Sequence, residues 1–323
     1  MPPTFPFPMI TVAIAFTVGF AVKRGGLCTY VAAMEIATKH SARSLLAFLG
    51  AAAWAGVVLI PLSWGDSQLV ALSWSHTSLA IALLGGLILG IGTYINQGCF
   101  FGTFIHLVRG NLTYMGTLLG LSLGVVVADG MLAGYKPPLD LAPLVADQGL
   151  VAALWLATMA ILVLVMLFHR DGTAGLVRRN RASISIMFAI GVGGGLLFGS
   201  VSGWDYGSVL TQVTRKALDT GAPGPTQLAA LSTLGLIAGG ITAAIRDGSF
   251  QLRLPSWRGF VASTAGGMLM GGAAIMIPGG NDGMLLIGIP SMAPHSLVSF
   301  ACMLASLIGL FLLAQRMKAN PST

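Results

Sequence analysis

The sequence contains a series of apolar segments that are each long enough to cross a lipid bilayer as a helix. A spanning helix needs roughly 20 mostly apolar residues. Only 8% of the residues are charged, where a soluble domain carries about a quarter, so this chain lacks the means to cover a water-facing surface. We therefore expect an all-α polytopic membrane protein with about nine transmembrane helices. The expected spans lie near 6–22, 44–62, 77–95, 112–130, 148–168, 183–201, 225–245, 258–278 and 294–314.

Four shorter apolar stretches begin at glycine-rich turns between the long segments: 25–38, 97–108, 203–217 and 279–290. They are too short to cross a bilayer. Non-helical backbone at membrane depth is tolerated only where protein or a water-filled cavity covers it. We expect these stretches to be re-entrant or broken half-helices.

Basic residues predict the orientation. If the four short stretches return to the side they left, the basic residues gather on one side, in the loops that hold Lys39, Arg43, Arg109, His169, Arg170, Arg178, Arg179, Arg181, Arg246, Arg253, Arg258, Arg316 and Lys318. The opposite loops, 63–76 and 131–147, hold three aspartates and one lysine. The positive-inside rule then places the N-terminus outside and the C-terminus in the cytoplasm. The net charge of +7 follows from the same bias and does not predict a nucleic-acid partner.

The start of the chain does not resemble a signal peptide. No basic stretch precedes the first apolar run, and no small-residue cleavage site follows it. We therefore expect the first hydrophobic segment to remain in the mature protein.

The chain aligns with itself at an offset of 181 residues. The glycines that coincide are Gly26 with Gly207, Gly85 and Gly86 with Gly266 and Gly267, Gly90 with Gly271, Gly98 with Gly279, and Gly102 with Gly283. This register predicts a first repeat over 1–135, a connecting span and basic loop over 136–182, and a second repeat over 183–323. The repeats have opposite predicted topology, a plan that recurs in transporters with the substrate site between repeats. Alternatively, both halves share only a general small-residue packing pattern.

The breaks carry the candidate chemistry. Glycine permits the backbone angles that end one helix and start another, and helix N-termini that open there attract anions. Thiols and neutral amides add hydrogen-bond donors that suit a soft, sulfur-bearing anion. The predicted path residues are Cys28, Cys99, Gln97, Gly98, Gly102, Gly280, Asn281 and Asp282. Asp282 either carries a coupling proton or lies at the outer interface, where a carboxylate costs little.

Three basic residues, Lys23, Arg24 and Arg109, are predicted to attract the anion at the inner mouth, although the first two also serve simply as topology signals. Cys302 lies within the ninth span, with no break around it, and is expected to fill space. The three cysteines include no CxxC pair. They predict no disulfide framework and no metal site, and we expect no cofactor.

These motifs together resemble the YeeE/YedE-like sulfur-transport family of bacterial inner-membrane proteins. The resemblance rests on RGGLC near the N-terminus, GG-x3-G-x7-GCFFG, and GGMLMGGAAIMIPGGNDG in the second half. It implies uptake of a sulfur anion, thiosulfate first, along the central path of an hourglass-shaped protein. It also implies thiols that hydrogen-bond the ion and a TusA-like cytoplasmic sulfur carrier as partner. Related members place a third cysteine in the break where this chain has Gly280-Asn281-Asp282, so a three-thiol relay is not expected here.

Three hypotheses follow. The first is a multi-pass inner-membrane transporter, embedded in lipid, that imports a small sulfur-containing anion and is not an enzyme. The second is a membrane thiol oxidoreductase that uses Cys28 and Cys99 as a redox pair. The third is a membrane anchor for a cytoplasmic sulfurtransferase, held through the basic loops at 169–181 or 246–258.

Overall fold

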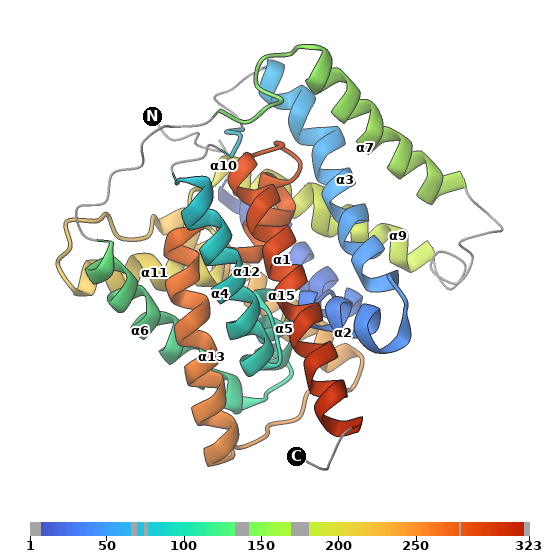
Figure 1. The fold of residues 1–323 in the computed structure, drawn as a ribbon. Helices are drawn as coiled ribbons and strands as arrows, with labels where there is room; N and C mark the ends of the chain where they lie inside the picture. Colours follow the sequence, from blue (N-terminus) through green and yellow to red (C-terminus); the bar gives the residue numbers. More distant parts are fainter. Residues whose placement is uncertain are drawn as a thin grey trace.

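The computed structural model describes residues 8–65, 70–73, 77–132, 142–168, 181–277 and 279–319. These residues form helices, with one isolated β-bridge between Asn111 and Arg253 (Figure 1). The helices are α1 (Pro8–Gly25), α2 (Thr29–Lys39), α3 (Arg43–Gly65), α4 (Leu79–Asn96), α5 (Phe100–Val108), η1 (Leu112–Tyr114), α6 (Met115–Met131), α7 (Leu150–Phe168), α9 (Arg181–Phe188), η2 (Ala189–Gly193), α10 (Gly194–Ser200), α11 (Tyr206–Ala217), α12 (Gln227–Arg246), α13 (Trp257–Met276), α14 (Gly280–Gly283), η3 (Met284–Gly288) and α15 (Pro294–Ala319).

The predicted class, an all-α polytopic membrane protein, is confirmed. Eight helical stretches of the described chain are long and apolar enough to cross a membrane. The predicted sixth span corresponds to a shorter apolar helix, Ile184–Ser200, which contains a π-helical turn at η2. Several loop segments used for the orientation lie outside the described residues, among them Asp66, Lys136, Asp140 and 169–180. The orientation itself stays a prediction.

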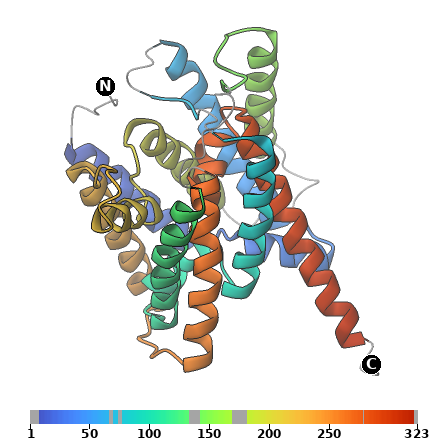
Figure 2. The same ribbon diagram turned by 60° about the vertical axis from the view of Figure 1, so that its left-hand side comes forward.

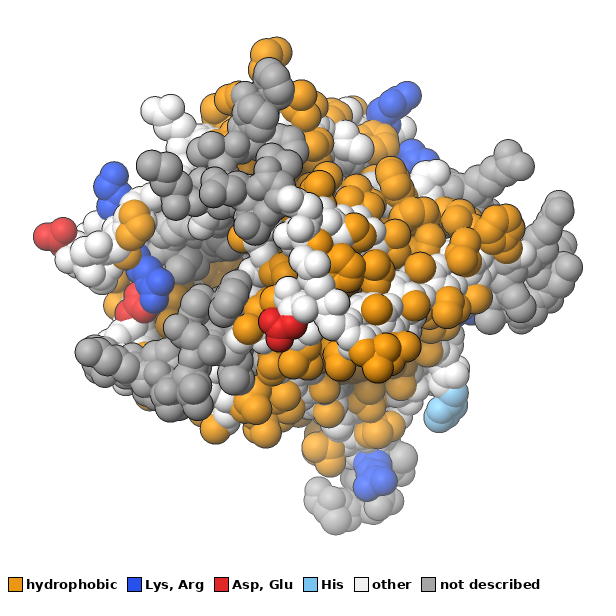
Figure 3. Space-filling view, turned by 90° about the horizontal axis from the view of Figure 1, so that it is seen from above, with side chains coloured by type: hydrophobic (Ala, Val, Ile, Leu, Met, Phe, Trp, Pro, Cys, Tyr) orange, Lys and Arg blue, Asp and Glu red, His pale blue; other side chains and the backbone are white. Residues whose placement is uncertain are grey.

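The surface is apolar where lipid would contact it. Helix α7 packs along α3 at the edge of the molecule (Figure 1), and its Trp155 indole N–H donates to the Pro290 carbonyl at 3.2 Å. Its outward side chains are large and exposed, with Leu154 59% and Ile161 58% accessible. Seen from above, hydrophobic side chains spread over the described surface with few charges among them (Figure 3). Such a surface is unfavourable in water and favourable in a bilayer.

Helices of the two halves of the chain pack against one another. Helix α13 lies along α6 and α4, and α15 lies along α4 (Figures 1 and 2). Helix α1 lies along α12. Glycines permit this approach: a methyl group on Gly120 would lie 2.1 Å from the Thr264 carbonyl oxygen, and one on Gly239 would lie 1.9 Å from that of Phe16. Small residues at helix interfaces are typical of membrane bundles.

The 181-residue offset carries over to the helices. Adding 181 to the bounds of α4 gives 260–277, where α13 spans Trp257–Met276. Adding it to α5 gives 281–289, where α14 and η3 together span 280–288. The packing is reciprocal as well, since α6 lies on α13 as α15 lies on α4. The repeat boundaries and the inversion of topology remain predictions.

Candidate functional site

Four short helices begin directly after interruptions of the chain, as the glycine-rich turns predict. Helix α2 follows the break at 26–28 and α5 the break at 97–99. Helix α11 follows the break at 201–205, and α14 begins after Gly279. Helix α5 contacts both α2 and α14, so breaks from the two halves meet in the interior of the molecule.

Two buried thiols lie side by side at this meeting point. Cys28 precedes α2 and Cys99 precedes α5, each at the N-cap position. Their sulfur atoms are 3.6 Å apart, and the backbone N–H of Thr29 donates to Cys99 Sγ at 3.3 Å. A methyl group on Gly102 would lie 2.6 Å from Cys28 Sγ, so this glycine makes room for the thiol. Two cysteines 71 residues apart thus form one cluster.

Asn281 joins the second half to this cluster. Its side chain is fully buried. The Oδ1 atom accepts from the backbone N–H of Phe100 at 3.1 Å, and Nδ2 donates to Thr29 Oγ1 at 3.3 Å. The amide therefore binds the first residues of both α5 and α2 and holds three of the four breaks together.

A second amide, Asn96, fixes the first-half break from inside. Its Nδ2 donates to the Gly98 carbonyl at 2.8 Å and to Thr103 Oγ1 at 2.9 Å, while Oδ1 accepts from Thr117 Oγ1 at 2.7 Å. Its neighbour Gln97, named as a path residue from the sequence, is exposed and has a left-handed backbone with φ 57° that ends α4. The buried amide at this break is thus Asn96.

A pocket of about 320 Å³ lies on the other side of Phe100. One polar stripe of α11 lines it, at the i, i+3, i+4, i+7 spacing of a helix face: Ser208, Thr211, Gln212 and Arg215. The floor contains the second-half break with Gly279, Gly280 and Asp282. Gly279 and Gly280 both have positive φ, at 91° and 57°, a conformation that glycine adopts readily.

Three charged groups set the electrostatics of this pocket. Asp205 caps α11: its Oδ1 accepts from the N–H groups of Gly207 and Ser208, each at 2.9 Å. Asp282 is 5% exposed. Arg215 is bound by both carboxylate oxygens of Asp129 on α6, with Nε 2.7 Å from Oδ2.

Phe100 separates the pocket from the thiols. Its ring lines the pocket, whereas neither Cys28 nor Cys99 does. The Tyr206 hydroxyl donates to the Phe100 carbonyl at 2.7 Å, and the Phe100 N–H donates to Asn281 Oδ1. The backbone of Phe100 is therefore held at both its N–H and its carbonyl group.

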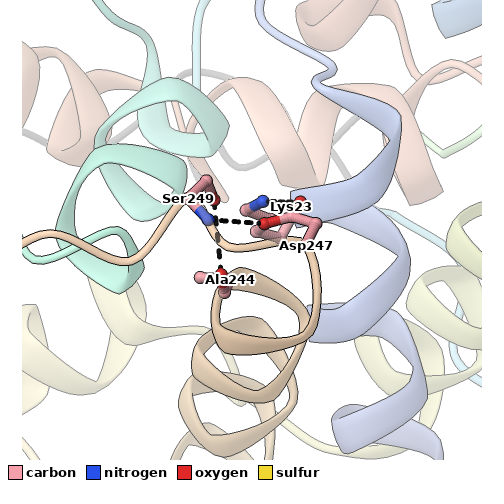
Figure 4. Close-up of polar contacts among 4 residues, drawn as sticks. All are labelled: Lys23, Ala244, Asp247 and Ser249. Carbon is pink, nitrogen blue, oxygen red and sulfur yellow. Dashed lines mark hydrogen bonds and ion pairs between the residues drawn. The ribbon is translucent and has the colours of Figure 1, made fainter.

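The three predicted inner-mouth residues differ in their surroundings. Lys23 is buried at the end of α1 and forms an ion pair with Asp247, which follows α12 (Figure 4). Asp247 also accepts from the Ser249 N–H at 3.1 Å. The ammonium of Lys23 and this second bond hold the pKa of Asp247 at about 2, below its usual range. Arg24 is exposed over the Phe20 ring, and Arg109 is exposed at the end of α5.

The third cysteine lies apart from the pocket lining. Cys302 is on α15, where its Cβ would be 3.0 Å from a methyl group on Gly86 of α4. It fits the predicted packing role at this helix contact. Within the described residues, no group of three or more His, Cys, Asp or Glu side chains is arranged to hold a metal ion.

Comparisons with known proteins identify the family of this chain. The sequence model of a protein family described as sulphur transport matches residues 24–309, which include all four breaks. The chain is also 26% identical, over 238 residues, to a thiosulfate transporter named TsuA from Spirochaeta thermophila, an alignment that covers 66% of this chain and 71% of the relative. The resemblance seen in the glycine and cysteine motifs is thereby confirmed, and the chain belongs to the sulphur-transport family.

Proposed function

We propose that this protein imports a small sulfur-containing anion, thiosulfate, across the bacterial inner membrane along a central path. The observation that carries the proposal is the pair of buried thiols 3.6 Å apart, joined through Thr29 and Asn281 to a pocket that ends at Phe100. The family match and the thiosulfate-transporting relative support the substrate class.

The route begins in the pocket. On the predicted orientation the pocket opens to the outer side, where the side-chain amide of Gln212 offers N–H donors to an oxyanion. The hydroxyls of Ser208 and Thr211 also line the pocket and donate to the Asp205 carboxylate and to the Gly207 carbonyl. Displacement of Phe100 then admits the ion to the thiols. There it lies at the N-terminal ends of α2 and α5, whose helix dipoles favour negative charge. The first N–H groups of these helices donate to Cys99 Sγ and to Asn281 Oδ1.

The thiols act as donors and as soft contacts. Each Sγ–H is a weak donor on a polarizable atom, which matches the terminal sulfur of thiosulfate better than a hard oxygen ligand does. The ion passes from Cys99 to Cys28 with the donors of the first-half break around it. No covalent bond to the substrate is needed in this route.

The inner end completes the route. Arg24 and Arg109 are exposed and attract the anion toward the cytoplasmic side, while the charge of Lys23 is already balanced by Asp247. A TusA-like sulfur carrier receives the ion there, at the basic loops around 169–181 and 246–258. Lipid surrounds the apolar belt.

The test is uptake of labelled thiosulfate into cells that lack other sulfate and thiosulfate permeases. Wild-type protein is expected to restore uptake, and Cys99→Ala to reduce it at least about tenfold, equivalent to ~1.4 kcal/mol. Cys302→Ala is the matched control, because it removes a thiol at a helix contact outside the pocket lining. Full uptake by Cys99→Ala would overturn the role of the thiols.

The same cells separate the other hypotheses. A Cys28–Cys99 disulfide that forms and turns over with quinone, in a protein that moves no thiosulfate, would indicate a thiol oxidoreductase. An anchor for a sulfurtransferase predicts that changes at the breaks have no effect, whereas neutralising the basic loops abolishes function.

A further inference from the structure

Asp282 is a buried carboxyl group that the proposed route does not use. It is 5% exposed and lines the pocket directly beside Asn281. In the part of the chain that the structure describes, it forms no ion pair and no hydrogen bond with another side chain. An ionised carboxylate without such partners is costly to bury, and intramembrane carboxylates usually mark ion or proton pathways.

The second acid of the pocket is differently placed. Asp205 accepts two backbone N–H bonds at 2.9 Å and the Ser208 hydroxyl, all of which stabilise its charged form. It is the N-cap of α11, and these donors hold its carboxyl group in that structural role. Within the described residues, the donors to Asp282 are the backbone N–H groups of Asp282 itself and Gly283, with no side-chain hydroxyl among them. Of the two acids, Asp282 is the one suited to gain and lose a proton.

The charges around Asp282 explain why a proton would matter. The titratable groups that face it are Asp205 and Tyr206 at the start of α11, Cys99 at the start of α5, and Arg215 across the pocket. Arg215 is already bound by Asp129. With Asp282 ionised the pocket is therefore negative and repels an incoming dianion. With Asp282 protonated, one negative charge disappears and an O–H donor is gained.

Asp282 is also next to the closure at Phe100. A methyl group on Gly280 would lie 3.2 Å from both Asp282 Oδ1 and a carbon of the Phe100 ring. The neighbouring residue, Asn281, holds the Phe100 N–H. A change of charge at Asp282 therefore occurs beside the Asn281 bond that holds the Phe100 N–H, and beside the Phe100 ring.

We propose that Asp282 couples anion uptake to a proton. The carboxyl group takes up one proton from the outer side, the dianion enters the pocket, and the proton is released to the cytoplasm after the anion has passed Phe100. One dianion and one proton together move one net negative charge inward instead of two, which lowers the work against an inside-negative potential. This inference rests on the proposed function.

The experiment uses the full-length protein in liposomes, with the membrane potential clamped and labelled thiosulfate outside. For one coupled proton, the steady-state accumulation of thiosulfate is expected to rise about tenfold for each pH unit by which the outside is more acidic. Asp282→Asn is expected to lose this pH dependence while it still equilibrates thiosulfate. Asp205→Asn, which retains a capping side chain, is expected to keep the slope whatever its rate of uptake.

Each outcome decides one point. Wild-type uptake that ignores the pH gradient overturns the coupling and leaves transport intact, whereas no uptake at all overturns the proposed function. A full slope in Asp282→Asn overturns the assignment of the proton to this residue. If Asp282→Asn fails to fold, the wild-type protein in weakly buffered solution gives the answer: about one proton taken up per thiosulfate bound supports the proposal, and none contradicts it.

Discussion

The two halves of this protein place different chemistry in corresponding breaks, although not at corresponding positions. In the first half, Cys28 and Cys99 lie together in the interior and do not line the pocket. In the second half, the matching breaks supply Asp205 and Asp282, which line the pocket. On the proposed route, soft thiols lie on one side of Phe100, and charged and hydroxyl groups lie on the other. If the two halves are repeats, as the 181-residue offset predicts, corresponding breaks are free to carry different side chains.

The backbones of the two halves differ as well. In the first half the left-handed residue that ends α4 is Gln97, with φ 57°. In the second half Gly279 and Gly280 both have positive φ. Gly98, the counterpart of Gly279, does not. Corresponding glycines therefore serve different purposes, and substituting them in pairs tests the comparison directly.

The largest effect is expected at Gly102 and its counterpart Gly283. A methyl group at Gly102 would lie 2.6 Å from Cys28 Sγ and must displace the thiol, whereas at Gly283 the nearest atom is a Phe198 ring carbon at 3.4 Å, an ordinary contact distance. We expect Gly102→Ala to reduce thiosulfate uptake at least about tenfold, or ~1.4 kcal/mol, with Gly283→Ala close to wild type. Uptake by both variants, corrected for the amount of protein in the membrane, measures the difference.

Equal uptake by these two variants would remove the argument that the thiol needs its present position. A loss in Gly283→Ala alone would reverse the comparison and assign the narrow point of the path to the second half.

The next effect concerns the two buried amides. Asn281→Leu leaves the Phe100 N–H without its acceptor, and Asn96→Leu leaves Thr117 Oγ1 without its acceptor. Each buried group left unpaired costs about 1–3 kcal/mol. We expect both variants to unfold at lower temperature in detergent, but only Asn281→Leu to change the pH dependence of uptake, since it adjoins Asp282. Identical transport behaviour in the two variants would contradict this division of roles.

A smaller effect is expected at Gly279 and Gly98. Alanine at Gly279 would take a left-handed conformation with φ 91°, at a cost of about 1–2 kcal/mol. Alanine at Gly98 meets its nearest atoms at 3.4 Å without a positive φ. Thermal unfolding of the purified variants should show Gly279→Ala as the less stable. Equal destabilisation of Gly98→Ala would contradict the difference in backbone conformation between the two breaks.

The sequence allowed the helices and breaks to be predicted because both depend on local pattern. Apolar length predicted the spans, and glycine turns predicted where α2, α5, α11 and α14 begin. The polar stripe of α11 that lines the pocket stands at helical spacing within 203–217, but this spacing alone does not predict a site. Asn96 is buried at this break and Gln97 is exposed, because α4 ends at Gln97. Two neighbouring amides in a sequence do not show at which of them the helix ends.

Pairings between distant residues were the part that sequence could not supply. Lys23 was predicted to attract substrate, yet its charge is matched by Asp247, 224 residues later in the chain. Arg215 and Asp129 are 86 residues apart and come from different halves. Such partners depend on how α1 packs along α12 and α11 along α6, which no local pattern encodes.

The smallest effect sharpens the comparison at the contact between the halves, where α1 of the first half meets α12 of the second. Asp247 has a pKa of about 2, below the value of ~3.9 expected in the unfolded chain. Its pairing with Lys23 therefore stabilises the fold fully above about pH 4, and this contribution is lost as the pH falls toward 2.

Asp247→Asn leaves the buried ammonium unpaired, so it should lower the unfolding temperature at pH 7. The difference in unfolding temperature between wild type and variant, the gap, should narrow between pH 4 and 2. Arg24→Gln, which changes an exposed charge one residue away from Lys23, serves as the control and should show no such narrowing. A gap that stays constant down to pH 2 would mean that the two halves are held here by helix packing alone.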